Sequence, residues 1–396
     1  MTSQHAFFAA VDEGDIVSCV SCGLCLPHCP TYRISGDDAQ SPRGRIALVA
    51  SVRSGALELN DDVTAALEGC VQCMGCLPAC PSGVRYDRII EPVVAELAAR
   101  RPWSMLGKRL LLAPIGRQRV LEGLTTIAAI AQRLRAVPRR FSLPRLSLRR
   151  RRILTGRFAH SSFDPVDVTL FTGCVMSAWY SDVHQATVDV LERLGCRVTL
   201  TNPSMCCGAL HRHAGLMRRA ERFENACASI GPGTTLIVNS AGCGANLMAT
   251  STNATDVMAY LATRLDDVLS ITERSSEAVV IHDPCHLRNV QRSHLATHAV
   301  LSSLYETETI PDEGLCCGAG GAYAITYPEA ASKIVDRKIV ALRSTNGTWI
   351  ASGNPGCSAH MEAHLPDDFA DRHVVHPIQL VARRLVNTTG SSDSHG

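Results

Sequence analysis

The sequence predicts a multidomain fold: a helical N-terminal module, a connector, and a pseudo-symmetric pair of α/β domains. Two internal repeats predict it. A cysteine run occurs twice in the first part of the chain, as CVSCGLCLPHCP and then as CVQCMGCLPACP. A longer unit, also built on cysteines, occurs twice after residue 166. Because a repeat of domain length indicates two similar units packed together, we expect domains over residues 1–100, 166–275 and 276–396, with a connector over 101–165.

Both short runs have the spacing C-x2-C-x2-C-x3-C-P. In two-cluster ferredoxins, three thiolates of each run bind one [4Fe-4S] cluster and the fourth, before proline, binds the other cluster. Zinc sites use separated C-x2-C pairs, and a disulfide framework needs an oxidising compartment, so both explain the pattern less well. The sequence therefore predicts a ferredoxin-like domain with two [4Fe-4S] clusters, one on Cys19, Cys22, Cys25 and Cys80 and the other on Cys70, Cys73, Cys76 and Cys29.

Helices are expected between and after these runs. Apolar residues at helical spacing follow Pro42, and Asp61 with Asp62 begins a short helix that leads into Cys70. Another helix is expected over residues 88–100. The spacer between the runs is longer than in small two-cluster ferredoxins, which favours a helical ferredoxin whose clusters lie between helices.

The connector has an apolar part and a basic part. Residues 120–137 form an amphipathic helix rather than a membrane span, because charged residues interrupt the ~18 apolar residues that a span needs. Nine arginines follow between Arg135 and Arg157, forming either a solvated linker or a patch that meets an acidic partner or anionic lipid headgroups. Nucleic acid is not an expected partner, since no reading module accompanies the patch. Without a signal-peptide pattern at the N-terminus, we expect a cytoplasmic protein, with peripheral association at the inner face of the cell membrane as the other option.

The repeated C-terminal unit predicts two parallel α/β sheets. β-rich runs at residues 168–171, 236–239, 279–281 and 349–351 alternate with amphipathic stretches such as 181–195. The cysteines then follow the carboxyl ends of strands, where open α/β sheets bind ligands, and the neighbouring Gly208, Gly318, Gly320 and Gly321 would allow close backbone approach to a ligand. The candidate ligands of a further cluster are Cys174, Cys206, Cys207 and Cys243 in the first copy and Cys285, Cys316, Cys317 and Cys357 in the second.

Other cysteines and histidines have plainer interpretations. Cys196 and Cys227 lie outside any spacing pattern, so we expect them to be buried small hydrophobes. Four histidines stand beside the cysteine motifs, where a histidine could ligate iron, hydrogen-bond a cluster sulfur or carry a proton. We favour a structural role for these four, which are His211, His213, His282 and His286.

Taken together, these motifs resemble the glycolate oxidase iron–sulfur subunit family. The resemblance rests on the double run followed by two Cys…Cys-Cys-Gly…Cys domains, and on the segments CPTYR, SPRGRI and CPSGVRYDRII. Anaerobic glycerol-3-phosphate dehydrogenase contains a chain of similar plan, and the paired domain also occurs in heterodisulfide reductase and in lactate-utilisation proteins. The full cysteine-rich domain of the heterodisulfide reductase type has five cysteines, whereas here Ser240 and Asn354 replace one in each copy. Four thiolates can still bind a cluster; the alternative is a scaffold that has lost its metal.

The resemblance implies an electron-transfer subunit. The sequence has no flavin or nicotinamide fingerprint, and oxidation of a hydroxy acid needs an organic cofactor, since clusters move single electrons. FAD is therefore implied on partner hydroxy-acid oxidase subunits, with electrons passing through this chain toward a quinone and with no catalytic residue here acting on the hydroxy acid. The alternatives are the corresponding component of anaerobic glycerol-3-phosphate dehydrogenase, a heterodisulfide reductase-like oxidoreductase with its own catalytic cluster, and a redox-sensing regulatory protein.

Overall fold

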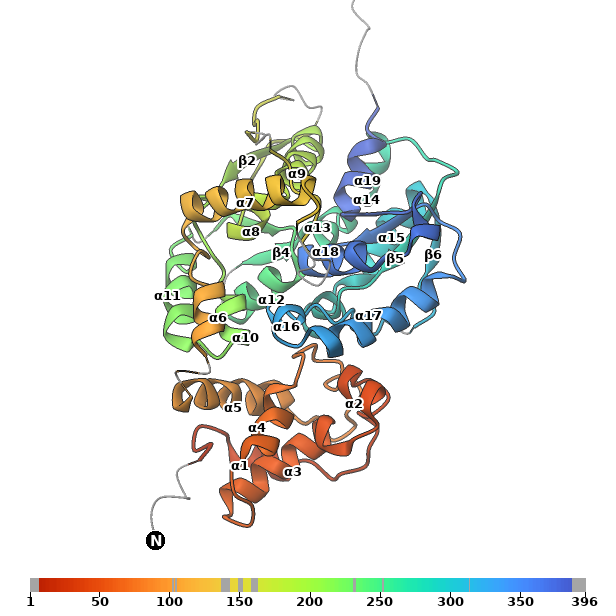
Figure 1. Ribbon diagram of the computed structural model, residues 1–396. Helices are drawn as coiled ribbons and strands as arrows, with labels where there is room; N and C mark the ends of the chain where they lie inside the picture. The colour runs from red at the N-terminus through yellow and green to blue at the C-terminus, as the bar shows by residue number, and fades with distance from the viewer. Residues whose placement is uncertain are drawn as a thin grey trace, which may run out of the picture.

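The structure is a computed structural model that describes residues 7–101, 103, 105–136, 143–148, 152–157, 163–230, 233–250, 253–312 and 314–386. Figure 1 shows a helical N-terminal domain below two α/β domains that lie side by side. This arrangement confirms the predicted fold class.

The N-terminal domain consists of short helices that begin at good capping residues. Its elements are α1 (Glu13–Val17), α2 (Pro30–Ser35), the 3-10 turn η2 (Asp38–Gln40), α3 (Pro42–Arg53), α4 (Asp61–Glu68) and α5 (Tyr86–Arg100). The Ser41 side chain caps α3 by accepting from the Gly44 N–H, and Asn60 caps α4 in the same way. At Gly44 a Cβ atom would lie 1.9 Å from the Asp38 carbonyl oxygen, so only glycine fits there.

These helices enclose one apolar core, and the cysteine loops border it. The core holds Val49, Leu67, Ile89, Val93 and Leu97, all almost fully buried. The helices predicted after Pro42 and at Asp61 are confirmed, and the third begins at Tyr86 rather than near residue 88.

Both α/β domains contain a four-stranded parallel sheet of the same topology. The strand orders are β2-β1-β3-β4 and β6-β5-β7-β8. The strands are β1 (Val166–Phe171), β2 (Cys196–Leu200), β3 (Thr235–Val238), β4 (Ala254–Asp256), β5 (Ala278–His282), β6 (Glu306–Thr309), β7 (Trp349–Ser352) and β8 (His373–Val375). The four predicted runs correspond to the two central strands of each sheet, which are the apolar ones, although β3 ends one residue before Asn239.

Helices cover the two sheets and join them. They are α8 (Cys174–Trp179), α9 (Ser181–Arg193), α10 (Ala209–His213), α11 (Met217–Cys227), α12 (Ala241–Ala249), α13 (Val257–Ala262), α14 (Leu265–Ser270), the π-helix η4 (Leu287–Gln291), α15 (His294–Leu304), α16 (Tyr323–Thr326), α17 (Pro328–Leu342), α18 (Pro355–His364), the 3-10 turn η5 (Asp367–Phe369) and α19 (Pro377–Arg383). Helix α19 packs on α9 and α13 packs on α15. The two α/β domains therefore share one apolar core.

The connector contains α6 (Leu106–Leu111) and α7 (Gln118–Arg133). Helix α7 confirms the predicted amphipathic helix, and Trp179 of α8 donates from Nε1 to Thr125 Oγ1 on it at 2.9 Å. In the part of the connector that the structure describes, the arginines Arg135, Arg145, Arg152 and Arg157 are exposed. The others of the run, Arg139, Arg140, Arg149, Arg150 and Arg151, lie outside the described residues. No helix in the described ranges combines the length and the apolar character needed to cross a bilayer.

Candidate iron–sulfur sites

The first cysteine run forms the loop between α1 and α2, at the surface of the N-terminal domain. Ser21 in this loop has a left-handed φ of 55°, and its carbonyl accepts from Arg43 Nη1 of α3 at 3.1 Å. This bond ties the loop to a helix of the core. Burial varies along the run: Cys19 and Cys25 are half-buried, Cys22 between them is exposed, and Cys29 is buried directly before α2.

The second run forms the loop between α4 and α5 and lies deeper, with Cys73 and Cys76 buried. Two donors lie beside the Cys70 thiol of this loop. The Gln72 backbone N–H and the Tyr86 hydroxyl donate to Cys70 Sγ, at 3.4 and 3.6 Å. Hydrogen bonds to sulfur stabilise ligating thiolates and help to set a cluster's reduction potential.

Arg45 places a buried positive charge beside this second loop. Its side chain is 1% exposed and donates to the Ala66 carbonyl at 2.7 Å, to Thr31 Oγ1 at 3.2 Å and to Gln40 Oε1 at 3.1 Å. Within the described part of the chain it pairs with no carboxylate, and its Nη1 lies 4.0 Å from Cys29 Sγ. Burial acts to lower the pKa of Arg45, but Tyr86, Cys70 and Cys29 outweigh it and raise the pKa. Because a buried charge needs a counter-charge, this environment fits an anionic thiolate-bound cluster.

The two loops meet at the predicted second cluster. Burial raises the pKa of the Cys76 thiol well above its usual range, and nearby Cys73, Cys70 and Cys29 raise it further. Cys29 of the first run thus lies near Cys76 and Cys70 of the second, in agreement with the predicted crossed ligand pattern. Both ligand sets remain predictions; in the first set, Cys25 lies near Cys19 whereas Cys22 faces solvent.

The first cysteine-rich domain gathers its four cysteines at the carboxyl edge of its sheet. Cys174 begins α8 after β1, the adjacent pair follows β2, and Cys243 lies in the first turn of α12 after β3. Cys174 Sγ and Cys206 Sγ are 3.4 Å apart. Hydrogen bonds with Cys174 and Cys207 lower the pKa of Cys206, and Cys207 also bonds with Cys243. The predicted convergence of these four residues is therefore present.

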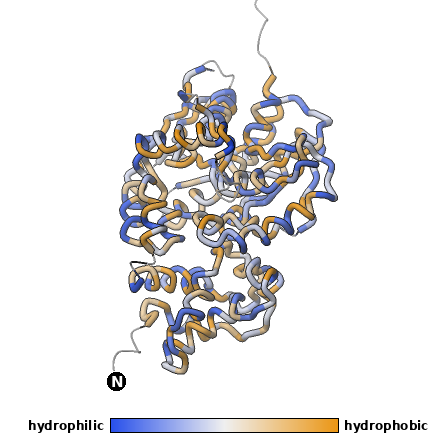
Figure 2. Tube along the Cα trace, viewed as in Figure 1, coloured by the Kyte–Doolittle hydropathy of each residue, from blue (hydrophilic) through white to orange (hydrophobic). Residues whose placement is uncertain are grey.

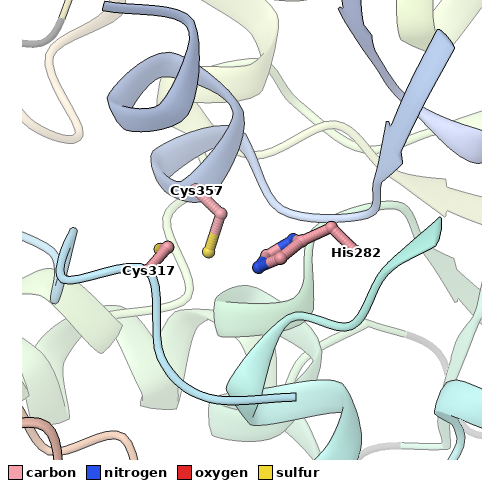
Figure 3. A group of neighbouring side chains, drawn as sticks. All are labelled: His282, Cys317 and Cys357. Atoms are coloured by element: carbon pink, nitrogen blue, oxygen red, sulfur yellow. The ribbon is translucent and has the colours of Figure 1, made fainter. Parts of the chain in front are cut away.

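The second cysteine-rich domain repeats this arrangement and adds a histidine. Cys285, Cys316, Cys317 and Cys357 form the same chain of sulfur contacts. His282, the last residue of β5, points toward Cys317 and Cys357, and one ligand atom from each of the three lies within 4.8 Å of the others (Figure 3). Ser352 Oγ lies 3.0 Å from His282 Nδ1, while the buried Nε2 has no hydrogen-bond partner among the described residues.

An orphaned imidazole nitrogen beside two thiols is a donor set that zinc or an iron–sulfur site would accept. His282 is thus a candidate ligand that the sequence interpretation treated as structural. A comparison of the two copies of the repeat could have singled out His282, because the corresponding position in the first copy is Phe171. The structure therefore distinguishes the two domains, since only the second places a histidine at this position.

The second cysteine-rich domain also touches the N-terminal cysteines. A hydrogen bond with Cys316 lowers the pKa of the Cys73 thiol, and Asn289 Nδ2 donates to the Cys73 carbonyl at 3.0 Å. Val71, Cys73, Cys285 and Cys316 share one buried cluster. The second loop of the N-terminal domain thus contacts the second cysteine-rich site. No sequence motif predicted this contact.

Gly208 and Gly318 shape the turns that hold the adjacent cysteine pairs. Both have left-handed φ angles, 88° and 86°, and a Cβ at either would lie 2.9 Å from a helix carbonyl, of Ala220 in α11 or Ala331 in α17. Their amides donate to Cys206 Sγ and Cys316 Sγ, at 3.5 and 3.3 Å. They therefore fix the packing of each cysteine turn against α11 or α17, and their role in the approach of a ligand stays a prediction.

Of the remaining sequence candidates, Cys196, Cys227 and His211 are buried, and His213 and His286 are half-buried. Cys196 and Cys227 are 4% and 0% exposed, which confirms their assignment as small hydrophobes. His211 is fully buried next to Phe223. His213 and His286 stack with ring centroids 5.3 Å apart, and His286 Nδ1 lies 3.6 Å from Cys285 Sγ.

The profile of the 4Fe-4S dicluster domain matches residues 15–84, and that of the cysteine-rich domain matches residues 168–248 and 279–362. The chain is 30% identical to the probable glycolate oxidase iron-sulfur subunit of Bacillus subtilis, with 91% of each chain covered. It is also 30% identical to the glycolate oxidase iron-sulfur subunit of Escherichia coli, covering 91% of this chain and 94% of that one. A chain of the dihydromethanophenazine:CoB–CoM heterodisulfide reductase of Methanosarcina acetivorans is 25% identical over 95% of each chain.

Proposed function

Because the chain belongs to the family of glycolate oxidase iron–sulfur subunits, we propose that it carries electrons in a complex that oxidises glycolate or a similar 2-hydroxy acid. Two [4Fe-4S] clusters, when bound, supply one-electron storage and transfer. The observation that carries the proposal is the gradient of burial across the two cysteine loops. The first loop reaches the surface at Cys22, whereas the second is buried against the second cysteine-rich domain at Cys73.

The surface around the first loop is the proposed docking site for the FAD-binding subunit. Val17, Val20 and Leu24 are 69%, 68% and 55% exposed, which is unusual for three apolar side chains so close in sequence to an exposed Cys22. Clustered exposed apolar residues mark interaction sites. A flavoprotein seated here would bring its electron-donating cofactor next to the loop that supplies the first cluster's ligands.

We propose that the connector rests on the membrane surface. One face of α7 packs inward through Leu121, Thr125 and Ala129. Its apolar side also has an exposed part, formed by Val120, Leu124, Ile127, Ile130 and Leu134. Figure 2 shows the hydrophobic colour along this helix.

A helix at the surface of a soluble protein is normally polar on the face that meets water. The exposed apolar face of α7 is therefore expected to contact another apolar surface. Exposed Leu106 and Leu110 of α6 extend the apolar surface, and the exposed Arg109, Arg119 and Arg133 bring positive charge to it. Apolar side chains mixed with cations suit the interface of an anionic bilayer.

The cysteine-rich pair supports a second metal-containing function. The buried Cys317, Cys357 and orphaned His282 favour a site in the second domain that holds a metal of its own. With such a centre the chain would resemble a heterodisulfide reductase-like oxidoreductase, and electrons would reach it across the contact of Cys73 with Cys316.

The test uses the anaerobically purified chain with and without the FAD-binding subunits. Glycolate should not bleach the cluster absorbance of the chain alone, because none of its groups accepts a hydride. Adding the flavoprotein subunits should produce bleaching that requires glycolate. Bleaching by glycolate without them, or no bleaching when both proteins carry their cofactors, would contradict the proposal.

A further inference from the structure

One cavity of about 380 Å³ lies between the two cysteine-rich domains, and all eight of their cysteines line it. We propose that this cavity binds the ring of a quinone, the electron acceptor of the proposed function on which this inference rests. The volume is within the range of small-molecule sites.

The cavity has two unlike halves. The cysteines, with Ser240 and Asn354, form one wall, and the connector forms the other through Leu112, Ile115, Leu121 and Ala128. A cluster needs only the thiol wall, because the connector wall offers it no ligand. The apolar half therefore suits a flat, uncharged ring, which favours apolar walls with a few polar groups.

Polar groups for the ring's carbonyl oxygens are present in the lining. His213 and His286 line the cavity and stack on each other. A neutral imidazole always carries one N–H donor, and within the described ranges the side-chain contact of His213 is its stacking on His286, while its carbonyl accepts from Gln72 Nε2. Its N–H is therefore available to a quinone carbonyl.

The position of the cavity suits electron transfer. Cys285 and Cys316 form part of its wall, and Cys316 bonds with Cys73 of the second N-terminal loop. A bound ring would take two electrons, one at a time, from the N-terminal clusters, which the flavoprotein reduces with electrons from the hydroxy acid. With two protons from water, both carbonyls become hydroxyls and the quinone becomes a quinol.

The cavity opens where the chain is proposed to meet lipid. Leu111 of α6 and Leu124 of α7 line the cavity and are also 39% and 47% exposed, so they mark a mouth between the two helices. Both belong to the exposed apolar surface of the connector. A membrane quinone could therefore enter from the bilayer without crossing water.

Binding is measured by quenching of Trp179, which lines the cavity. Trp103 and Trp349 are first replaced by phenylalanine in the cluster-loaded chain, so that Trp179 alone reports. The probe is decylubiquinone in buffer without lipid, and saturable quenching is expected. Ala128→Phe, which fills the apolar half, should weaken binding at least tenfold. The matched control is Ala226→Phe, at an exposed position of α11, which should bind as the parent does.

Leu124→Asp is a second variant at the mouth, where a half-exposed side chain leaves the core intact, and it should also weaken binding. No saturable quenching in the parent, or parental affinity in both Ala128→Phe and Leu124→Asp, would overturn the assignment. Reduction of the clusters by glycolate through the flavoprotein is measured on the same samples. If that reduction persists while the probe fails to bind, the quinone site is wrong and the electron-transfer function stands; if reduction itself fails, the proposed function is wrong.

Discussion

Arg45→Met is expected to lower the reduction potential of the cluster assigned to Cys29, Cys70, Cys73 and Cys76. The guanidinium is 1% exposed, and its Nη1 lies 4.0 Å from Cys29 Sγ. A unit charge at that distance is worth about 4 kcal/mol at an effective dielectric constant of about 20, or about 170 mV for one electron. Because the added electron spreads over a cluster that extends beyond the sulfur, we expect a fall on the order of 100 mV.

The assay is a redox titration of the full chain followed by electron paramagnetic resonance, after iron analysis has shown that both clusters are present. Arg45→Lys keeps the charge and should retain most of the parental potential, although it cannot make all of the bonds to Ala66, Thr31 and Gln40. Arg53→Met is the matched control, because Arg53 ends the same helix and donates to the Val11 carbonyl.

An unchanged potential in fully loaded Arg45→Met would show that the Arg45 charge does not act on this cluster. A fall of equal size in Arg45→Lys would also count against such an action, since the effect would then come from lost hydrogen bonds rather than from charge.

Three further predictions concern other parts of the chain. Cys317→Ser should reduce the metal content of the full chain if the second cysteine-rich site is metallated, and Cys207→Ser tests the first in the same way; unchanged metal and spectra in both would make the pair a scaffold. Replacing Leu110 and Ile127, each 65% exposed, by serine should weaken the affinity for anionic phosphatidylglycerol vesicles, measured by co-sedimentation, about tenfold or more. The control Leu295→Ser, at an exposed position of α15, should keep the parental affinity, and an equal loss in both would exclude a specific membrane face. Burial lowers the pKa of His184 to about 4, below its ordinary value of about 6.5, so unfolding takes up a proton and stability falls as pH drops from about 6.5 toward 4. Denaturant titration at pH 7 and pH 5 should show a loss of about 2 kcal/mol from this residue that His184→Gln removes, and an equal pH dependence in parent and variant would contradict it.

The cysteine spacing was the most informative part of the sequence, because metal ligation constrains spacing more tightly than packing constrains composition. It predicted the two N-terminal loops, and the repeat predicted two sheets with cysteines after their strands. The edge strands were less visible: β6 reads ETET, with little apolar signal, since an edge strand need not bury both faces.

Features that depend on contacts between distant segments could not be predicted. Arg45 resembled an ordinary surface arginine of a helix, and its burial follows only from the way α3, α4 and the cysteine loops pack. The contact of Cys73 with Cys316 joins residues from different domains. His282 was interpreted as structural, because its role depends on Cys317 and Cys357, which come from other loops of the fold.

Two neighbouring [4Fe-4S] clusters in the N-terminal domain are the basis of the proposed electron transfer. Iron and sulfide analysis, with electron paramagnetic resonance, of the anaerobically purified full chain and of Cys73→Ser measures them. We predict about eight irons on the N-terminal cysteines, together with a spectrum of two magnetically interacting clusters that loses this interaction in Cys73→Ser. Zinc in place of iron after anaerobic reconstitution, or the signal of a single isolated cluster in the parent, would contradict this prediction.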